Sequence, residues 1–252
     1  MEKIKGTLFL MALLGLIGLS SCGGGGNSSP TPPAQPSAAA GIWFGTFTSN
    51  VTHTVSKATG LVADTNSARF GFTDTFEQFS GVLSVVNNSF SLTATAFAPH
   101  GGTLPDGTKV GTVTITGTFT PQSTMTGTYS GAGDSGTFTL TFSPLYQRLS
   151  SFGLLKGTWS GEILEHSTGL TISDNAQITG VNTAGCTYGG HLDLIDPSFN
   201  IYAIHLDIDT CGSDNGSYDG LAYLSDEHEQ NGTLNVIMSS PTLSIIATLN
   251  KK

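Results

Sequence analysis

The sequence predicts an all-β protein of two tandem antiparallel meander β-barrel-like units, about eight strands each, after a signal peptide and a flexible tether. Both halves consist of short segments in which apolar and polar residues alternate between Gly, Asn, Asp or Pro turns, with almost no helical period. The two tryptophans stand in the same G-x-W-x-G-x-apolar frame, at residues 41–47 and 157–163. The repeated frame marks the start of each unit, and eight strands suffice to close a small barrel.

The first 21 residues have the features of an export signal. Lys3 and Lys5 precede an apolar run of about a dozen residues that starts near Leu8, and small residues follow it before Cys22. A run of this length is too short to span a bilayer as a helix. We therefore predict a signal peptide over residues 1–21.

The residues Leu19, Ser20, Ser21 and Cys22 resemble the lipobox of bacterial lipoproteins. The resemblance implies that Cys22 becomes the mature N-terminus and carries acyl chains such as palmitate, and several chains hold a protein firmly to a membrane. Residue 23 is Gly rather than Asp, which by the sorting rule of that family implies the outer membrane, with the membrane face left open. The alternative is an ordinary secretory signal with a cysteine beside its cleavage site.

Residues 22–40 are expected to form the tether. Beyond Cys22 they are Gly, Ser, Pro, Ala, Asn, Thr and Gln, without a large apolar side chain. Such a composition cannot bury enough surface to offset the entropy of ordering. A flexible Gly-rich start and a Pro-rich spacer are therefore expected to separate the anchor from the folded units.

The first unit is predicted over residues 41–149. Val113 and Ile115 alternate with threonines, which is typical of a strand with one buried face. We expect strands at 41–49, 51–57, 68–74, 78–86, 89–97, 109–119, 123–130 and 135–143. Seven aromatic residues fall early in this unit, and either a packed core or the wall of a ligand cavity would use them: Trp43, Phe44, Phe47, Phe70, Phe72, Phe76 and Phe79.

The second unit is predicted over residues 150–252, with a boundary near Ser150. Residues 145–155 are the one mature stretch expected to form a helical turn. We expect strands at 157–165, 169–173, 176–182, 186–195, 199–209, 216–225, 231–239 and 242–249.

The charge balance excludes nucleic acid as a partner. Without Glu2, Lys3 and Lys5, the mature chain keeps 17 acidic and 7 basic residues, a formal net charge of −10. A surface that follows phosphates needs clustered Lys and Arg, which here stand singly except at Lys251 and Lys252. The acidic excess lies in the second unit, with 12 acidic and 3 basic residues, against 5 and 4 in the first.

Apart from Cys22, the chain has two cysteines, Cys186 and Cys211. In an exported protein the default expectation is that they pair. Closing a loop of this length contributes about 3.5 kcal/mol in the chain-entropy account. Two free thiols are the alternative.

The two G-x-W frames resemble the first strand of calycins, the group of lipocalins and avidins. The resemblance implies eight-stranded barrels in which Trp43 and Trp159 each close one end. Lipocalins also carry a basic residue from a later strand over that tryptophan, and the sequence does not indicate its counterpart here. Separately, Gly185-Cys186-Thr187-Tyr188 with a later Cys-Gly is similar to a segment of bacterial lipoproteins, a likeness that implies no activity.

A hairpin is predicted around a turn at 196–199. With Leu192 opposite Ile204, His191 lies opposite His205 on the outer face, and Asp193 and Asp207 are the next neighbours there. Two imidazoles and two carboxylates could hold a zinc-type ion. An ordinary solvated strand face is the alternative and the preferred interpretation, so no metal is predicted.

The same hairpin leads into a group of hard oxygen ligands that would suit calcium. Its spacing does not match the twelve-residue calcium loop, because the third ligand position falls on Cys211. An ordinary acidic turn is therefore preferred for these residues: Asp207, Asp209, Asp214, Asn215 and Asp219.

The sequence carries no nucleophile elbow, no phosphate loop with a lysine, and no distinct carboxylate pair. We therefore expect a lipid-anchored envelope protein with a non-enzymatic binding or structural role, without a cofactor. A lipocalin-like carrier of a small apolar ligand is the alternative, and an enzyme is third. A barrel with an interior void would favour the carrier, and a filled one the interaction protein.

Overall fold

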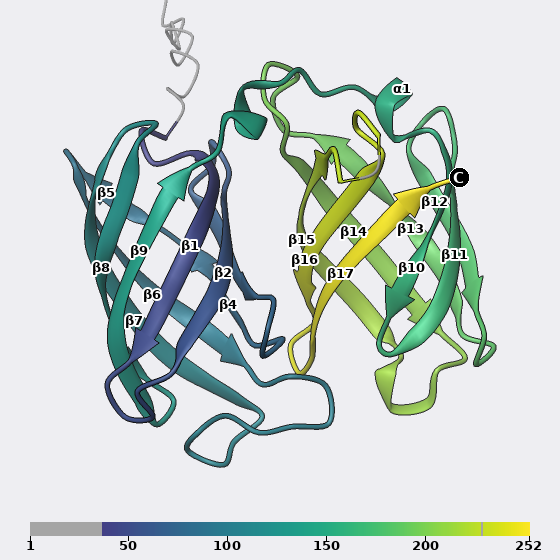
Figure 1. Cartoon of the computed structure of the whole chain (residues 1–252). Helices are drawn as coiled ribbons and strands as arrows, with labels where there is room; N and C mark the ends of the chain where they lie inside the picture. The colour runs from purple at the N-terminus through teal and green to yellow at the C-terminus, as the bar shows by residue number, and fades with distance from the viewer. Residues whose placement is uncertain (1–36, 228) are drawn as a thin grey trace, which may run out of the picture. The chain divides into compact units, whose positions relative to one another are not determined.

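The computed structural model of the chain describes residues 37–227 and 229–252. The signal peptide, Cys22 and most of the tether lie outside the described residues, so lipidation stays a prediction. Within the described ranges, no helix combines the length and the apolar character needed to cross a membrane. The prediction of an all-β protein is confirmed: two closed antiparallel barrels follow one another along the chain (Figure 1).

The first barrel is a meander in which each strand pairs with the next except β4 with β5, and β1 pairs with β9. The pairing of β4 with β6 closes it, with Phe79 opposite Ala96. Its strands are β1 (Gly41–Ser49), β2 (Val55–Val62), β3 (Ser67–Phe72), β4 (Gln78–Val82), β5 (Ser84–Val86), β6 (Ser89–Phe97), β7 (Val110–Thr120), β8 (Thr124–Gly131) and β9 (Asp134–Phe142).

One predicted strand of this barrel, 78–86, is broken in two. Leu83 turns into the core with 3% of its surface exposed, and its backbone N–H donates to the Asn66 carbonyl at 2.9 Å. Because that N–H leaves the ladder, β4 ends at Val82 and β5 pairs only with β6. The unit therefore counts nine strands, of which eight form the closed barrel.

The second barrel has the predicted eight strands and closes by pairing β10 with β17, where Trp159 lies opposite Lys251. Its strands are β10 (Gly157–Ile163), β11 (His166–Ile172), β12 (Gln177–Asn182), β13 (Thr187–Leu194), β14 (Tyr202–Asp209), β15 (Gly216–Ser225), β16 (Thr233–Ser239) and β17 (Ser244–Lys251).

The G-x-W-x-G frame has the same role in both barrels. Trp43 and Trp159 are fully buried, and each indole N–H donates to the carbonyl four residues earlier, Ala39 at 3.2 Å and Leu155 at 2.7 Å. The second glycine of each frame allows the neighbouring strand to come close. A Cβ on Gly45 would lie 2.0 Å from the Thr139 carbonyl oxygen, and one on Gly161 would lie 2.3 Å from that of Thr248.

The tether ends before residue 40, where we predicted its end. Ala39 is fully buried and Ala40 is 8% exposed. Small side chains fit beneath Trp43, and the Ala39 carbonyl accepts the indole N–H. The last residues before β1 therefore belong to the folded body.

The prediction for the early aromatic residues is right for five of the seven. Trp43, Phe47, Phe70, Phe72 and Phe79 are buried in the core of the first barrel. The prediction is wrong for the other two: Phe44 is 37% and Phe76 is 56% exposed. Phe44 alternates with Trp43 and so faces outward, and Phe76 lies in the β3–β4 turn with φ of +59°.

The segment between the barrels forms the predicted helical turns, η1 (Pro144–Gln147) and α1 (Phe152–Leu155). Ser150 lies between them, and the division into domains there stays a prediction. The barrels also share a third buried cluster. From the first barrel and the connection it contains Ala40, Ile42, Leu61, Ala63 and Tyr146, and from the second Ile201, Leu221, Tyr223 and Ile237.

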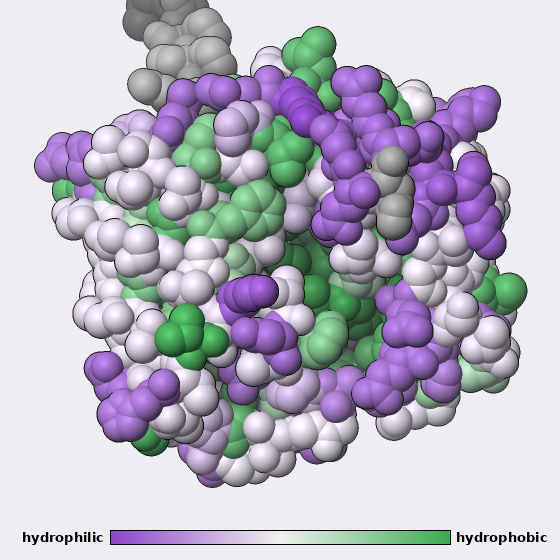
Figure 2. Space-filling view, viewed as in Figure 1, coloured by the Kyte–Doolittle hydropathy of each residue, from purple (hydrophilic) through white to green (hydrophobic). Residues whose placement is uncertain are grey.

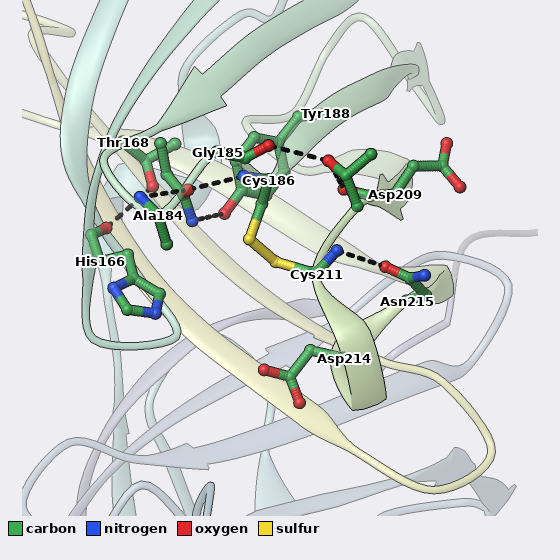
Figure 3. Close-up of a disulfide and its surroundings, with 12 residues drawn as sticks. His166, Thr168, Ala184, Gly185, Cys186, Tyr188, Asp209, Cys211, Asp214 and Asn215 are labelled. Atoms are coloured by element: carbon green, nitrogen blue, oxygen red, sulfur yellow. Dashed lines mark hydrogen bonds between the residues drawn. A yellow bond between two sulfur atoms is a disulfide. The ribbon is translucent and has the colours of Figure 1, made fainter.

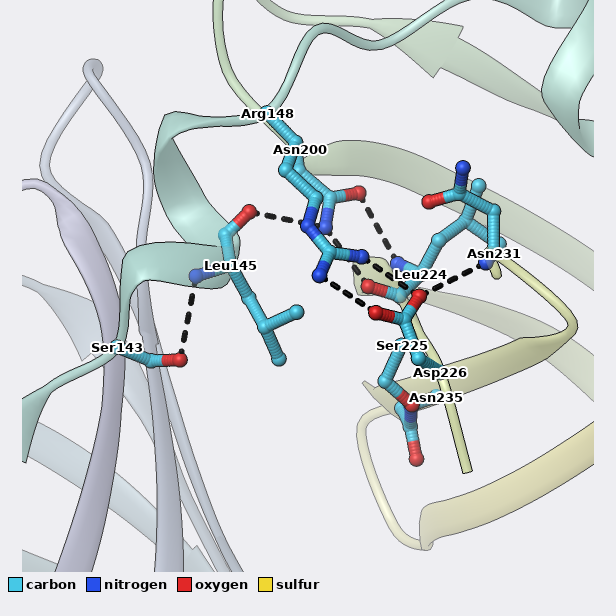
Figure 4. Close-up of polar contacts among 9 residues, drawn as sticks. All are labelled: Ser143, Leu145, Arg148, Asn200, Leu224, Ser225, Asp226, Asn231 and Asn235. Atoms are coloured by element: carbon cyan, nitrogen blue, oxygen red, sulfur yellow. Dashed lines mark hydrogen bonds and ion pairs between the residues drawn. The ribbon is translucent and has the colours of Figure 1, made fainter. Parts of the chain in front are cut away.

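Polar contacts fix the connection against the second barrel (Figure 4). Asn200 is 1% exposed, its Nδ2 donates to the carbonyls of Leu145 at 3.2 Å and Leu224 at 2.7 Å, and its Oδ1 accepts the Leu224 N–H at 3.1 Å. Nearby, Arg148 donates to both carboxylate oxygens of Asp226, at 2.6 and 2.5 Å. A fully bonded buried amide of this kind sets one relative position of the joined segments.

Candidate functional site

A cavity of about 200 Å³ opens at one end of the first barrel. Its wall includes Ser49, which ends β1, and Ser56 at the start of β2, whereas Trp43 lies near the beginning of β1. The cavity therefore occupies the end opposite the tryptophan. Exposed Thr52, Thr54 and Thr75 form its rim. The first barrel is closed at one end and hollow at the other.

Aromatic rings form the wall of this cavity. The ring of Phe47 lies 5.0 Å from that of Phe72 and 5.5 Å from that of Tyr129, and Phe72 and Phe79 are also 5.0 Å apart, measured between centroids. Most of these pairs meet edge to face or tilted, the arrangement that aromatic quadrupoles prefer. The wall thus contains a group of contacting aromatic rings, with the Tyr129 phenol at one side.

Asp134, the first residue of β9, fixes the polar side of the cavity. One carboxylate oxygen accepts the hydroxyl of Ser49 at 2.7 Å and the backbone N–H of Ser135 at 2.7 Å, and the other accepts the Tyr129 hydroxyl at 2.8 Å. Burial, and then the bond to Asp134, raise the pKa of Tyr129 far above its usual value. Tyr129 is thus held as a neutral donor whose ring cannot turn away.

Glu77 is the second acidic residue in the wall, placed there by the reversal of the chain at Phe76. Burial, and then the negative charges of Asp134 and Asp74, raise the pKa of the Glu77 carboxyl. Unlike Asp134, this carboxylate accepts no hydrogen bond from residues 37–227 or 229–252. The cavity therefore contains one carboxylate that is bonded within the protein and one, Glu77, that is open to solvent.

The loop between β6 and β7 covers one side of the opening. Leu104 is 3% exposed and packs into the core of the first barrel, and its N–H donates to the Thr108 carbonyl at 2.7 Å. Gly133, in the β8–β9 turn with φ of +81°, lies so close to Asp106 that a Cβ there would be 2.5 Å from its backbone nitrogen. The glycine lets the turn and the loop pack together at the rim.

The buried core of the second barrel is mostly aliphatic and has four aromatic residues, against nine in the core of the first. Trp159, Tyr202 and Tyr218 are each at most 1% exposed within its core. Tyr218 donates to the Asp214 carbonyl at 2.8 Å, and burial raises the pKa of Tyr202 to about 12. The Tyr202 hydroxyl accepts the backbone N–H of Ser151 at 3.3 Å, so the hydroxyls of both tyrosines have hydrogen-bond partners.

Lys251 supplies the basic residue over the tryptophan that the calycin resemblance implies. Its Nζ lies 5.2 Å from the centroid of the Trp159 ring and donates to the Leu154 carbonyl at 2.9 Å. The first barrel lacks this arrangement at the equivalent position. Phe142, opposite Trp43 on β9, meets that indole edge to face at 5.5 Å.

The predicted disulfide between Cys186 and Cys211 is present, with the Cα atoms 4.8 Å apart (Figure 3). The predicted pairing of His191 with His205 also holds, and would place Cys186 opposite residue 210. Thr210, with φ of +60°, is the extra residue that brings Cys211 into reach, and its hydroxyl donates to the Gly185 carbonyl at 2.8 Å. Asn182 supports the other cysteine by accepting its backbone N–H at 3.0 Å.

The structure brings together the four residues considered for a zinc-type ion, but each is already paired. His191 Nε2 lies 3.4 Å from Asp193, and His205 lies 3.4 Å from Asp207 and 2.8 Å from Asp219. The bond to Asp219 is the main cause of a raised pKa of His205, which favours the protonated form that cannot bind metal. Among the described residues, no group of three or more His, Cys, Asp or Glu is placed to hold a metal ion.

The acidic residues considered for calcium bind other partners. Asn215 accepts the Cys211 N–H at 2.6 Å, Asp207 accepts the Ser217 hydroxyl, and Asp214 lies 3.4 Å from His100 of the first barrel. Asn215, Asp207 and Asp214 are therefore engaged with residues of the turn, a neighbouring strand and the first barrel, and the interpretation of this group as an ordinary acidic turn stays a prediction.

A recess also separates the two barrels on one side, and Figure 2 shows apolar side chains on its floor. Its volume is about 440 Å³, and Phe44, Leu145 and Tyr223 supply its apolar lining. The rings of Phe44 and Tyr223 face each other at 6.2 Å. This recess is shallower and more open than the cavity of the first barrel.

Of the seven aromatic residues that the sequence offered for the core or a cavity wall, the structure places Phe47, Phe72 and Phe79 in the wall and not the other four. Sequence reasoning missed Glu77, Tyr129 and Asp134. The only local signal for them was an acidic residue in each of two turns, which is what solvated turns also carry.

No protein-family model matches the chain, and no curated protein sequence matches it. Among solved structures, one similar chain is described as a "putative outer membrane protein" from Bacteroides fragilis NCTC 9343. The two share 15% sequence identity at a TM-score of 0.31, over 84% of this chain and 97% of that one.

Proposed function

We propose that this protein is a lipid-anchored protein of the bacterial envelope that carries a small, largely apolar ligand in the open end of its first barrel, without catalysing a reaction. The lipobox-like residues before Cys22 and the Gly- and Pro-rich tether support the anchor and, with Gly23, the outer membrane. The cavity in the first barrel supports the ligand. A structural or partner-binding role is the competing hypothesis.

The observation that carries the proposal is the 200 Å³ cavity with its aromatic wall. A cavity of about 150 Å³ lined by apolar side chains is already enough to bind benzene. The rings of Phe47, Phe72 and Phe79 are fixed by their mutual contacts, so a ligand would enter a preformed site rather than order one.

The polar groups of the cavity are engaged in ways that favour binding over catalysis. The Ser49 hydroxyl donates to Asp134, and its oxygen accepts the backbone N–H groups of Val51 and Thr52 at 3.1 and 2.9 Å. An oxygen with these three partners is not free to act as a nucleophile. Ser49 is better understood as the residue that shapes the β1–β2 turn.

Binding can be tested with toluene and 2-phenylethanol, followed by calorimetry and by shifts in the melting temperature of the full chain. We expect saturable binding at one site. Val113→Phe should fill the cavity and weaken binding at least about tenfold, the effect expected when a small apolar ligand loses its site. Val82→Phe makes the same change at a residue that is 66% exposed, and should leave affinity unchanged.

Ser56→Trp provides a second variant if Val113→Phe folds poorly, because it obstructs the half-buried rim and not the core. Absence of saturable binding in the folded wild-type chain would reject the carrier function and favour the structural or partner-binding role. Equal binding by the wild type and both obstructed variants would place the ligand elsewhere.

The anchor has its own test. Cells that express the wild type in the presence of a labelled acyl precursor should incorporate the label, and the protein should partition with membranes. Cys22→Ser should abolish both, whereas Cys186→Ser should leave both unchanged. Membrane partition of Cys22→Ser equal to that of the wild type would contradict the anchor.

A further inference from the structure

We infer that the ligand of the first barrel is a small cation: an ammonium group on an aromatic or short aliphatic body, with the apolar part inside the ring of phenylalanines and the charge beside Glu77. This inference rests on the proposed carrier function and specifies its ligand class. It is carried by the charge of the cavity wall, by the difference in bonding between its two carboxylates, and by the aromatic surface around them.

The wall of the cavity has one sign of charge. Glu77 and Asp134 are its charged residues, and no Lys, Arg or His contributes to the lining. Asp74 adds a third negative charge close enough to raise the pKa of Glu77. A carboxylate ligand such as a fatty acid would meet repulsion here, whereas an ammonium group would be attracted.

The two carboxylates differ in their hydrogen bonds. Asp134 has both oxygens occupied by Ser49, Tyr129 and the Ser135 N–H, so it orders the wall. Glu77 is half-buried and has no hydrogen-bond donor within the described residues. A carboxylate in that position loses part of its hydration without a compensating partner. A ligand cation supplies the missing partner.

The aromatic wall suits the same ligand. Phe72 and Phe79 lie in the wall together with Glu77, and Tyr129 completes the ring of aromatic residues. Aromatic faces attract ammonium groups, and the attraction is stronger where water is displaced. The cavity volume exceeds that of a benzene site, which leaves space for a short chain between the ring of a ligand and its amine.

The test uses three ligands of similar size and different charge: 2-phenylethylamine, 2-phenylethanol and phenylacetate. Calorimetry on the full chain at pH 7 should rank them in that order, with the amine at least about tenfold tighter than the alcohol, the gain expected of one partly desolvated charge-assisted contact. Glu77→Gln should reduce this preference to about threefold or less and leave the affinity of the alcohol unchanged.

The control is Glu162→Gln, the same change at an exposed residue of the second barrel, which should retain the full preference. Lowering the pH through the titration of Glu77 should weaken binding of the amine and not of the alcohol. Asp134, Asp74 and the Tyr129 hydroxyl face this carboxylate whichever of the two ligands is bound, so they affect the binding of both ligands alike.

The outcomes separate the two proposals. If the alcohol binds and the amine binds no tighter, the cation is rejected and the carrier function stands. If the amine is preferred equally by the wild type and Glu77→Gln, the assignment to Glu77 is wrong. If none of the three ligands binds the folded chain, the carrier function itself fails.

Discussion

The two barrels begin with the same frame but are completed by different residues. Trp43 and Trp159 occupy equivalent positions, and the residue opposite each on the closing strand is Phe142 in the first barrel and Lys251 in the second. The first barrel has a phenylalanine-rich core and opens into a cavity, whereas the core of the second contains three tyrosines and the barrel is tied by a disulfide. The same barrel plan is thus completed with different interior residues.

The comparison teaches that the frame specifies barrel closure and leaves the interior free to vary. The glycines and the indole bond to the preceding segment recur in both barrels. Phe47 at the end of the frame lines the cavity of the first barrel together with residues from other strands and turns. Four sets of variants test the difference between the two barrels.

Replacing either tryptophan should produce the largest loss of stability. Trp43→Ala and Trp159→Ala should each lower the free energy of unfolding by about 3–5 kcal/mol, the usual cost of truncating a buried aromatic side chain. Each variant retains one tryptophan, in the other barrel, whose fluorescence reports unfolding there. Because a buried cluster joins the barrels, we expect the reporter barrel to lose stability too. An unchanged urea midpoint of the reporter would show that the barrels unfold independently.

Removing the disulfide should affect the second barrel by a comparable amount. The double variant Cys186→Ala, Cys211→Ala should lose about 3.5 kcal/mol, because its unfolded chain regains the entropy of the open loop. Urea unfolding followed by Trp159 fluorescence in a Trp43→Phe background measures the loss. A reducing agent should shift the midpoint of the wild type and leave that of the double variant in place. Equal midpoints for oxidised and reduced wild type would contradict the prediction.

Lys251→Met should have a smaller effect. It removes the cation–π contact with Trp159 and the hydrogen bond to the Leu154 carbonyl, which together contribute about 1–2 kcal/mol. Lys252→Met, at the exposed neighbouring residue, serves as the control and should change stability by less than about 0.5 kcal/mol. Thermal unfolding of the two variants compares them directly. Equal melting temperatures would mean that Lys251 contributes no more than an ordinary surface charge.

The ion pair beside the connection between the barrels should contribute least to the free energy of unfolding. Asp226→Asn should cost a few tenths of a kcal/mol, because the pair with Arg148 is partly exposed. The Arg148 hydrogen bond lowers the pKa of Asp226 to about 2. The contribution is therefore complete above the unfolded-state pKa of about 3.9 and is lost as the pH falls through about 2. The free energies of unfolding of the wild type and the variant, measured against pH, should become equal at this low pH. They should also become equal in high salt.

Much of the fold could be predicted from the sequence because its determinants are local. Alternating side chains located most of the strands, although the one predicted at 51–57 lies at Val55–Val62. The pattern of the β13–β14 hairpin fixed the pairing of His191 with His205 and the reach of Cys211 to Cys186. The break at Leu83 could not be predicted, since it depends on a backbone bond to Asn66 in another turn. The outward position of Phe44 follows from its alternation with Trp43 on β1, and that of Phe76 from its place in the β3–β4 turn.

The site could be predicted only in part. The phenylalanines were visible as a cluster along the chain, but Glu77 and Asp134 come from separate turns that meet only when the barrel closes with its particular stagger. The role of Lys251 could not be predicted for the same reason, because it depends on which strands meet when the barrel closes. A lysine pair near the chain end resembles an ordinary solvated tail, and its place over Trp159 depends on pairing between the first and last strands of the barrel.

The buried position of Ala39 beneath Trp43 also determines where the chain enters the folded body. This point is the end of the first barrel at which Trp43 lies, and the cavity lies at the other end of β1. The backbone of residues 37–40, which leads into β1, therefore does not cross the opening of the cavity.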